Sequence, residues 1–184
     1  MAAIVLGALT QATDRTPWLA AILADRLRAP GLAIAAAAIA LAGNYTIGVI
    51  GGLMIAPLLT PEARTLLLAL ALVLAGAGTA FSDKSPDRLE GWRVGRGVTV
   101  FAGLAIMVFG DRMQFIVAAL AARSPLPWAA AVGATMGALG VTTAAVVLGE
   151  RQWLALPQRW LRIGVAGVLV VAGVVIGLSA VSLI

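Results

Sequence analysis

Long apolar segments alternate with short polar or proline-containing stretches along the chain. Each apolar segment approaches or exceeds the roughly 20 residues that an α-helix needs to cross the hydrocarbon core of a bilayer. Turn signals such as Arg28–Gly31 and Ser124–Pro127 stand between them. The pattern predicts an all-α, polytopic membrane protein with six transmembrane helices, which we place at residues 2–25, 31–57, 63–82, 95–122, 126–149 and 160–183.

The amino-acid composition agrees with a protein that lies almost entirely in or at the membrane. Hydrophobic residues make up 61% of the chain and charged residues 11%, whereas a soluble domain carries about 25% charged residues. Histidine and cysteine are absent, which excludes a histidine-ligated metal, a histidine general base and thiolate chemistry. The chain shows no catalytic constellation, so we expect neither an enzyme nor a bound cofactor.

Basic residues flank the apolar segments instead of forming a continuous positive face. We therefore attribute the net charge of +5 to membrane topology and not to nucleic-acid binding. The side of the membrane with more arginine and lysine should be cytoplasmic, which places both termini outside. With six spans, one side receives Arg26, Arg28, Lys84, Arg88, Arg93, Arg96, Arg151, Arg159 and Arg162, and the other receives Arg64 and Arg123.

The chain resembles itself when it is shifted by 97 residues, so that Asp14-Arg15 coincides with Asp111-Arg112. We therefore expect an internal duplication. Because each half contains three spans, an odd number, the two halves must enter the membrane from opposite sides. Such 3+3 inverted-topology repeats are typical of secondary transporters, whose binding site lies near the bilayer midplane. The predicted parts are a first three-helix repeat at residues 1–82, a polar connector at 83–94 and a second three-helix repeat at 95–184.

Asp14 and Asp111 each lie inside an apolar segment and are followed directly by an arginine. A charged residue at the bilayer centre costs at least about 2.5–3.5 kcal/mol, which favours a functional role for both pairs. One interpretation is that the aspartates line a path for a metal cation or for protons, with Arg15 and Arg112 as ion-pair or proton-path residues. The alternative is that each aspartate pairs with an arginine as a buried structural contact between helices.

The neighbours of the two aspartates offer further oxygen ligands for a hard cation. In a continuous helix, Asp14 shares one face with Thr10 and Gln11, which precede it by four and three residues. Gln114 follows Asp111 by three residues and shares its face. The predicted metal site therefore comprises Asp14, Asp111, Gln11, Thr10 and Gln114.

Other polar residues in the apolar segments also bear on a pathway. Pro17 is expected to kink the first helix and to free the carbonyl of Thr13 beside Asp14. Three neighbouring residues of the second segment either line a pathway or form hydrogen bonds between helices, namely Asn44, Tyr45 and Thr46.

The two Asp-Arg motifs resemble those of a known transporter family. Residues 108–113 read Val-Phe-Gly-Asp-Arg-Met and residues 11–16 read Gln-Ala-Thr-Asp-Arg-Thr. They are similar to the Glu-x-Gly-Asp-(Lys/Arg)-(Thr/Ser) motif that opens each repeat of the cation–proton exchanger family once catalogued as uncharacterised protein family sixteen. That family includes Golgi and chloroplast proteins that handle manganese and calcium, and bacterial manganese exporters. The resemblance implies exchange of manganese or calcium for protons across a bacterial inner (plasma) membrane.

Both glutamates of the family motif are missing, because Gln11 and Val108 stand in their places. The family's metal site is thought to use four acids, of which Asp14 and Asp111 are present here. Two alternatives to the antiporter therefore stay open. One is a degenerate, non-transporting membrane subunit. The other is an exporter of an organic solute such as an amino acid, in which the Asp-Arg pairs hold a zwitterion.

The expected partners follow from the same features. They are the lipid bilayer and a small inorganic cation, together with either a second copy of the chain in a homodimer or a partner membrane protein.

Overall fold

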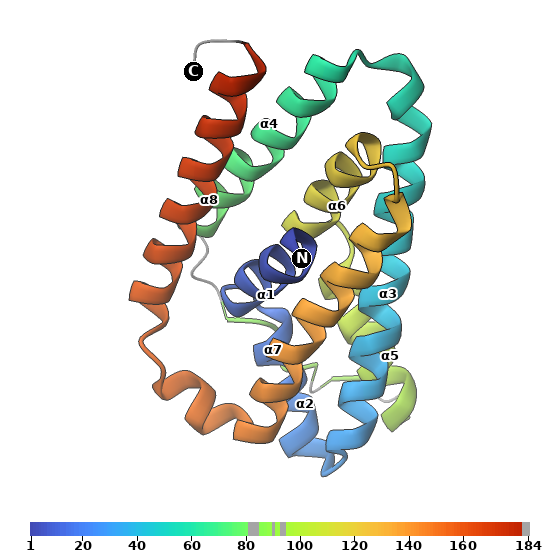
Figure 1. Cartoon of the computed structure of the whole chain (residues 1–184). Helices are drawn as coiled ribbons and strands as arrows, with labels where there is room; N and C mark the ends of the chain where they lie inside the picture. The colour runs from blue at the N-terminus through green and yellow to red at the C-terminus, as the bar shows by residue number, and fades with distance from the viewer. Residues whose placement is uncertain (81–84, 90, 93–94, 182–184) are drawn as a thin grey trace.

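The computed structural model describes residues 1–80, 85–89, 91–92 and 95–181. Within these ranges the chain forms α-helices, one short 3₁₀ turn and no β-strand (Figure 1), so the all-α prediction is confirmed. In chain order the elements are α1 (Ala2–Ala12), α2 (Thr16–Leu27), α3 (Pro30–Ile55), η1 (Ala56–Leu58), α4 (Pro61–Ala80), α5 (Arg96–Val108), α6 (Arg112–Arg123), α7 (Pro127–Ala155) and α8 (Gln158–Ala180).

Four of these helices are long and apolar enough to cross a membrane, namely α3 with its 3₁₀ extension, α4, α7 and α8. The pair α5 and α6 is bent by 61° at a short break and counts as a fifth span if its two parts are taken together. The predicted helix over residues 2–25 is two helices, α1 and α2, separated at residues 13–15. The described residues therefore contain four or five candidate spans, and the count of six stays a prediction.

The end of α7 differs from the predicted segment at 126–149. The helix continues to Ala155, past Gly149, whose φ of 77° interrupts the helical path. Such a positive φ is readily available only to glycine. The charged residues that follow are typical of a solvated loop, but they are held in place, because the Glu150 N–H donates to the Asp25 carboxylate at 2.8 Å.

The helices follow the same order in both halves of the chain. Each half begins with two short helices separated by a break, and two longer helices follow. Pro30 and Pro127 begin α3 and α7, and their separation of 97 residues equals the offset of the sequence repeat. Much of the predicted connector, together with the predicted span ends at 82 and 183, lies outside the described residues; this includes Asp83, Lys84, Glu90, Arg93 and Val94.

The short helices of the two breaks pack closely against the long helices. Helix α1 packs along α7, and α3 packs against α6 and α7, while α4 and α8 lie side by side at one edge of the molecule (Figure 1). Glycines allow the closest approach. A Cβ added to Gly7 of α1 would lie 2.5 Å from the backbone oxygen of Ala134 in α7. Small residues let membrane helices approach in this way.

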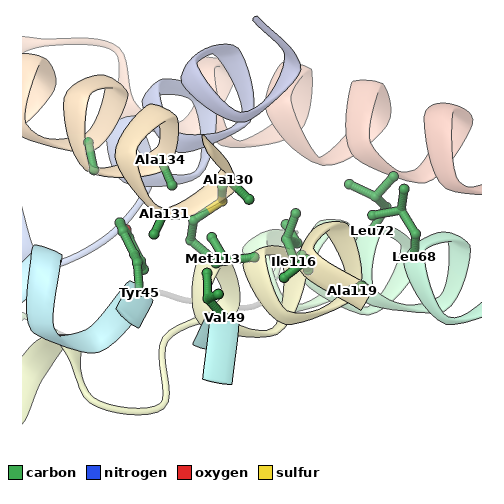
Figure 2. Packing of buried hydrophobic residues seen from close by; sticks show 14 of the residues in the cluster. Tyr45, Val49, Leu68, Leu72, Met113, Ile116, Ala119, Ala130, Ala131 and Ala134 are labelled. Atoms are coloured by element: carbon green, nitrogen blue, oxygen red, sulfur yellow. The ribbon is translucent and has the colours of Figure 1, made fainter. Parts of the chain in front are cut away.

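A buried apolar cluster lies beside the break between α5 and α6. It includes Tyr45, Val108, Met113 and Ile116, each at most 1% exposed. Figure 2 shows side chains of α3, α6 and α7 meeting there. The cluster fixes the start of α6, and with it the charged residues that precede and begin this helix.

Candidate functional site

Asp14 lies in the break between α1 and α2, and its carboxylate holds the start of α2. Its Oδ2 atom accepts hydrogen bonds from the Thr16 N–H at 3.1 Å and from the Thr16 hydroxyl at 2.6 Å. The N–H of Asp14 donates to the Gln11 carbonyl at 3.1 Å and so closes the end of α1. The prediction that Asp14 shares a helical face with Thr10 and Gln11 is therefore wrong.

The local sequence explains this break. An aspartate shortly before a proline is a helix-start signal, because the carboxylate accepts from free N–H groups and proline fits the first turn, where its missing N–H is not needed. Pro17 lies in the first turn of α2. The expectation that Pro17 kinks a continuous helix is also wrong, because the helical hydrogen bonds of α1 stop before Pro17 is reached.

Asp111 has the matching place in the second half, at the start of α6. It is the N-cap residue, and its Oδ1 atom accepts the Gln114 N–H at 2.8 Å. The Gln114 side chain forms a second hydrogen bond across the same turn, in which its Oε1 atom accepts the Gly110 N–H at 3.0 Å. This arrangement is close to a capping box. The amide oxygen of Gln114, a predicted cation ligand, is thus engaged in holding the turn.

The two aspartates therefore lie at the N-termini of interrupted helices. The N–H groups at a helix start carry partial positive charge, which stabilises a carboxylate nearby. Discontinuous helices with such termini form the ion and substrate sites of secondary transporters. The breaks explain how two charged aspartates are held inside an apolar bundle.

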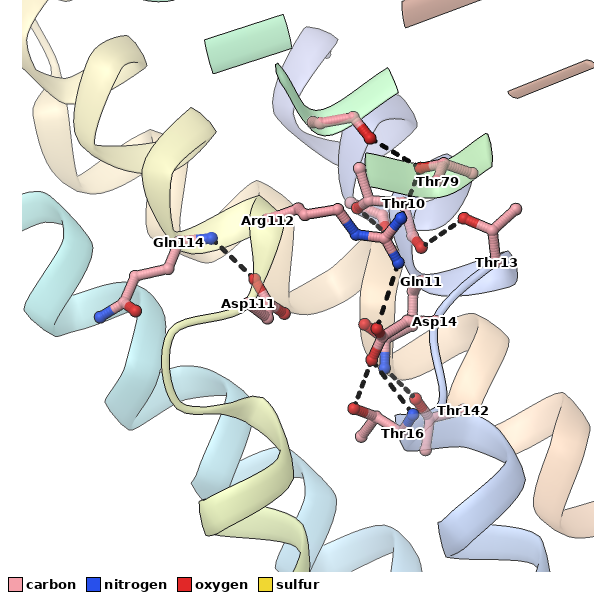
Figure 3. A network of polar contacts seen from close by, with 12 residues as sticks. Thr10, Gln11, Thr13, Asp14, Thr16, Thr79, Asp111, Arg112, Gln114 and Thr142 are labelled. Carbon is pink, nitrogen blue, oxygen red and sulfur yellow. Dashed lines mark hydrogen bonds and ion pairs between the residues drawn. The ribbon is translucent and has the colours of Figure 1, made fainter. Parts of the chain in front are cut away.

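Arg112 connects the two halves of the chain (Figure 3). Its Nη2 atom forms an ion pair with Asp14 Oδ1 at 3.4 Å, and its Nη1 atom donates to the Thr79 hydroxyl oxygen of α4 at 2.6 Å. The side chains of Arg112 and Asp14 are 21% and 19% exposed, so the pair is partly accessible. Arg112 thus pairs with the aspartate of the other half, and Thr79 is a site residue that no motif indicated.

Tyr45 of α3 reaches the second aspartate. Its hydroxyl donates to Asp111 Oδ2 at 3.5 Å, and its side chain is fully buried. Tyr45 therefore belongs to the site, through a hydrogen bond between helices.

Thr10 and Gln11, two further predicted ligands, make packing contacts. The Thr10 hydroxyl donates to a carbonyl of its own helix at 2.7 Å. The Gln11 Nε2 atom donates to the Thr142 hydroxyl oxygen at 3.1 Å and joins α1 to α7 (Figure 3). Arg15 immediately precedes α2 and has an interaction of its own. Of the predicted set, Arg112 pairs with Asp14, and Gln114 is hydrogen-bonded to Asp111.

The acidic residues by themselves do not make a metal centre. In the described part of the chain, no group of three or more His, Cys, Asp or Glu side chains could hold a metal ion. Asp14 and Asp111 supply two carboxylates, whereas hard divalent cations take about six or more oxygen ligands. A transported cation bound here needs neutral oxygens from other helices or from water.

Two cavities are lined by residues that follow the aspartates in the sequence. A polar cavity of about 590 Å³ extends from residues 85–88 to Trp18, one helical turn after Asp14. An apolar cavity of about 460 Å³ lies between the end of α3, α4 and α6 and reaches Arg112. The first cavity has a polar lining that suits water, whereas the second suits apolar groups.

Comparison with known proteins assigns the chain to a family. The family model for the divalent cation/proton antiporter GDT1 matches residues 1–87 and 97–183. This protein belongs to the GDT1 family. The match confirms the resemblance to cation–proton exchangers inferred from the motifs. No curated protein and no solved structure matches the chain.

Membership of the GDT1 family makes the protein a membrane transporter. Both helix breaks, at residues 13–15 and 109–111, lie within the matched ranges. GDT1 proteins are transporters, which agrees with the expectation that this chain is not an enzyme. The apolar helices agree with an integral membrane location.

Proposed function

We propose that this protein exchanges manganese or calcium for protons at a site formed by its two Asp-Arg motifs. The observation that carries the proposal is the ion pair between Arg112 and Asp14, which joins the two halves beside the second carboxylate, Asp111. Two carboxylates at the starts of interrupted helices supply the charge for a divalent cation. The GDT1 match supports cation/proton antiport as the class of transport.

The proposed architecture has six spans. The pairs α1–α2 and α5–α6 each form one broken span, and α3, α4, α7 and α8 supply the other four. Each half then crosses the membrane three times, so the halves are inverted relative to each other. The equal order of helices and the matching positions of the two breaks support this arrangement, in which alternating access follows from movement of one half against the other.

Charge balance suggests how the exchange works. Two ionised carboxylates carry a charge of −2, which one divalent cation or two protons neutralise equally well. Arg112 occupies Asp14 when neither is bound, and it must leave Asp14 when the metal arrives. Arg112 therefore acts as a tethered cation that competes with the substrate.

The orientation is part of the proposal. Arg26 Nη1 donates to the Arg88 carbonyl at 2.9 Å, and Arg88 pairs with Glu150, so the ends of α2 and α7 meet at one end of the bundle. Arginines gather there, which favours a cytoplasmic location for this end. Both termini are then outside, in a bacterial inner membrane. The polar cavity lined by Trp18 and Arg88 lies at the same end.

Purified protein in liposomes tests the proposal directly. Vesicles are loaded with a pH-sensitive dye, and Mn²⁺ or Ca²⁺ is added outside. As metal enters, protons should leave and the lumen should become more alkaline, whereas vesicles without protein should not respond. A flat trace from correctly inserted, monodisperse protein would contradict the proposal.

A non-transporting subunit is the second candidate, and the absence of a third acidic ligand among the described residues favours it. Co-purification of a stable membrane partner, together with a flat trace from the isolated protein, would support it. Protection of cells against an amino acid load without any metal dependence would instead support the organic-solute exporter.

Arg112→Gln should bind Mn²⁺ more tightly than the wild type. Removing the guanidinium frees Asp14 from its internal partner, so we expect the dissociation constant to fall by about tenfold, which corresponds to about 1.4 kcal/mol. Titration of purified protein with Mn²⁺ measures the effect. Arg123→Gln, at the exposed end of the same helix, serves as the control and should leave the constant unchanged. Weaker Mn²⁺ binding by Arg112→Gln would show that the arginine does not compete with the metal.

A further inference from the structure

We propose that Asn44 of α3 supplies a neutral oxygen ligand to the transported divalent cation beside Asp111, at a site where the chain lacks the motif glutamates. This inference rests on the proposed function and adds a residue that determines metal affinity. It uses a helix that lies outside both Asp-Arg motifs.

Helix α3 packs directly on the first turn of α6. Tyr45 donates to Asp111 Oδ2 at 3.5 Å. A Cβ added to Gly48 would lie 2.8 Å from the Gln114 carbonyl oxygen and 3.4 Å from the Gln114 Cγ. Gln114 is the residue whose N–H is bound by Asp111. Gly48 follows Asn44 by one helical turn, so the face that carries both residues runs along the start of α6.

The preceding turn of the same face packs on α5. Ala40 lies one turn before Asn44 and belongs to a buried cluster with Val100 and Leu104 of α5. Asn44 therefore lies between a turn that shares a buried cluster with α5 and a turn that contacts α6. The break between α5 and α6, at residues 109–111, separates these two helices and contains Asp111.

The Asn44 side chain is buried without a partner. It is 5% exposed, and neither its Nδ2 nor its Oδ1 atom has a hydrogen bond. Leaving a buried amide unsatisfied costs about 1–3 kcal/mol, so an apolar residue would serve packing better at this position. The cost is explained if the amide oxygen is kept for a ligand, and carboxamide oxygens are ordinary ligands of hard divalent cations.

The two motif positions that usually carry glutamate cannot fill this role. Gln11 is turned toward Thr142 of α7, to which it donates at 3.1 Å. Val108 is an apolar side chain, fully buried in the core. By contrast, Asp111 Oδ2 faces α3, where Tyr45 already reaches it. The oxygens beside Asp111 that can complete a cation site therefore come from α3.

Mn²⁺ binding to the purified full-length protein tests this assignment. Free Mn²⁺ is followed by electron paramagnetic resonance at pH 8, so binding is read without transport. Asn44→Val should raise the dissociation constant at least about tenfold, the effect of about 1.4 kcal/mol of lost interaction. Thr135→Val is the matched control, because the Thr135 hydroxyl donates to the Ala131 carbonyl of its own helix, and it should bind Mn²⁺ as the wild type does.

Asn44→Asp separates a ligand from a packing residue. A carboxylate at this position adds negative charge beside Asp111, so Mn²⁺ should bind at least about tenfold more tightly than to the wild type. A residue far from the bound cation would not give tighter binding when it becomes charged, and Asn44→Val reports whether the native amide itself contributes. The variant also keeps the test decisive if Asn44→Val does not fold.

The outcomes distinguish this inference from the proposed function. Unchanged Mn²⁺ binding in Asn44→Val, or no tightening in Asn44→Asp, overturns the role of Asn44, while metal-driven proton movement in wild-type liposomes still stands for the antiporter. Absence of both Mn²⁺ binding and proton movement in the wild type overturns both. Weaker binding in Asn44→Val with tighter binding in Asn44→Asp supports the assignment.

Discussion

Liposomes that contain Asp111→Asn should show no proton movement when Mn²⁺ or Ca²⁺ is added. The described part of the chain brings two carboxylates to the site, so this substitution removes half of the charge that faces a divalent cation. Two unit charges about 4 Å apart attract each other by about 4 kcal/mol at an effective dielectric constant of about 20, and a divalent cation is attracted more strongly. Loss of this charge therefore lowers cation affinity by at least about a thousandfold, well outside the working range of the assay.

This substitution is informative because it should spare the fold. Asp111 is the N-cap of α6, and asparagine caps a helix as well as aspartate does. Loss of transport can then be assigned to charge and not to unfolding. Glu62→Gln is the control, because Glu62 is exposed in the first turn of α4, at the opposite end of this helix from Thr79, and its flux should equal that of the wild type. Normal metal-driven flux in Asp111→Asn would falsify a site built on the two motifs.

Gly137→Val should prevent the protein from reaching its folded state. A Cβ at Gly137 would overlap the backbone oxygen of Ile4 and lie 2.8 Å from the backbone nitrogen of Ala8. Backbone atoms cannot turn aside as a flexible side chain can, so α1 must move away from α7. Overpacking of a well-packed core costs about 1–3 kcal/mol, occasionally more, and here the whole contact of α1 with α7 is affected. Size-exclusion chromatography of a fluorescent fusion should show aggregate in place of a monodisperse peak.

A second glycine of the same helix supplies the matched control. Gly140 lies about one turn further along α7, and a Cβ added there meets no atom within 4 Å. Gly140→Val should therefore give the wild-type elution profile and thermal stability. Equal behaviour of the two variants would show that the crossing of α1 and α7 is less tight than the structure indicates.

The sequence predicted the class of the protein, and it indicated Asp14 and Asp111 as the centre of a candidate site. Apolar segments of membrane length can be recognised without any knowledge of tertiary contacts. The energetic cost of placing Asp14 and Asp111 inside such segments can be recognised in the same way. The helix breaks were missed, although Asp14 and Pro17 carried a helix-start signal. The apolar pattern continues through each break, so the hydropathy of the segment does not show that the backbone changes direction there.

The partners of the two aspartates could not be read from their own segments. Arg112 pairs across the repeat with Asp14, and Thr79 and Tyr45 come from other helices. Helical spacing describes neighbours within one segment, whereas these contacts depend on how α3, α4 and α6 pack. The predicted ligand roles of Thr10, Gln11 and Gln114 rested on that spacing. Their hydrogen bonds instead close turns and join helices.

The ion pair between Arg112 and Asp14 has a consequence for the proton gradient across the membrane. A membrane that stores energy as a proton gradient is drained by any carrier that lets protons slip through without cargo. When no cargo is bound, Arg112 occupies the Asp14 carboxylate, so any other cation must first displace the arginine. The contact that joins the two halves thus also limits proton leak through the empty carrier. Vesicles with Arg112→Gln should lose an imposed pH gradient faster than wild-type vesicles when no metal is present.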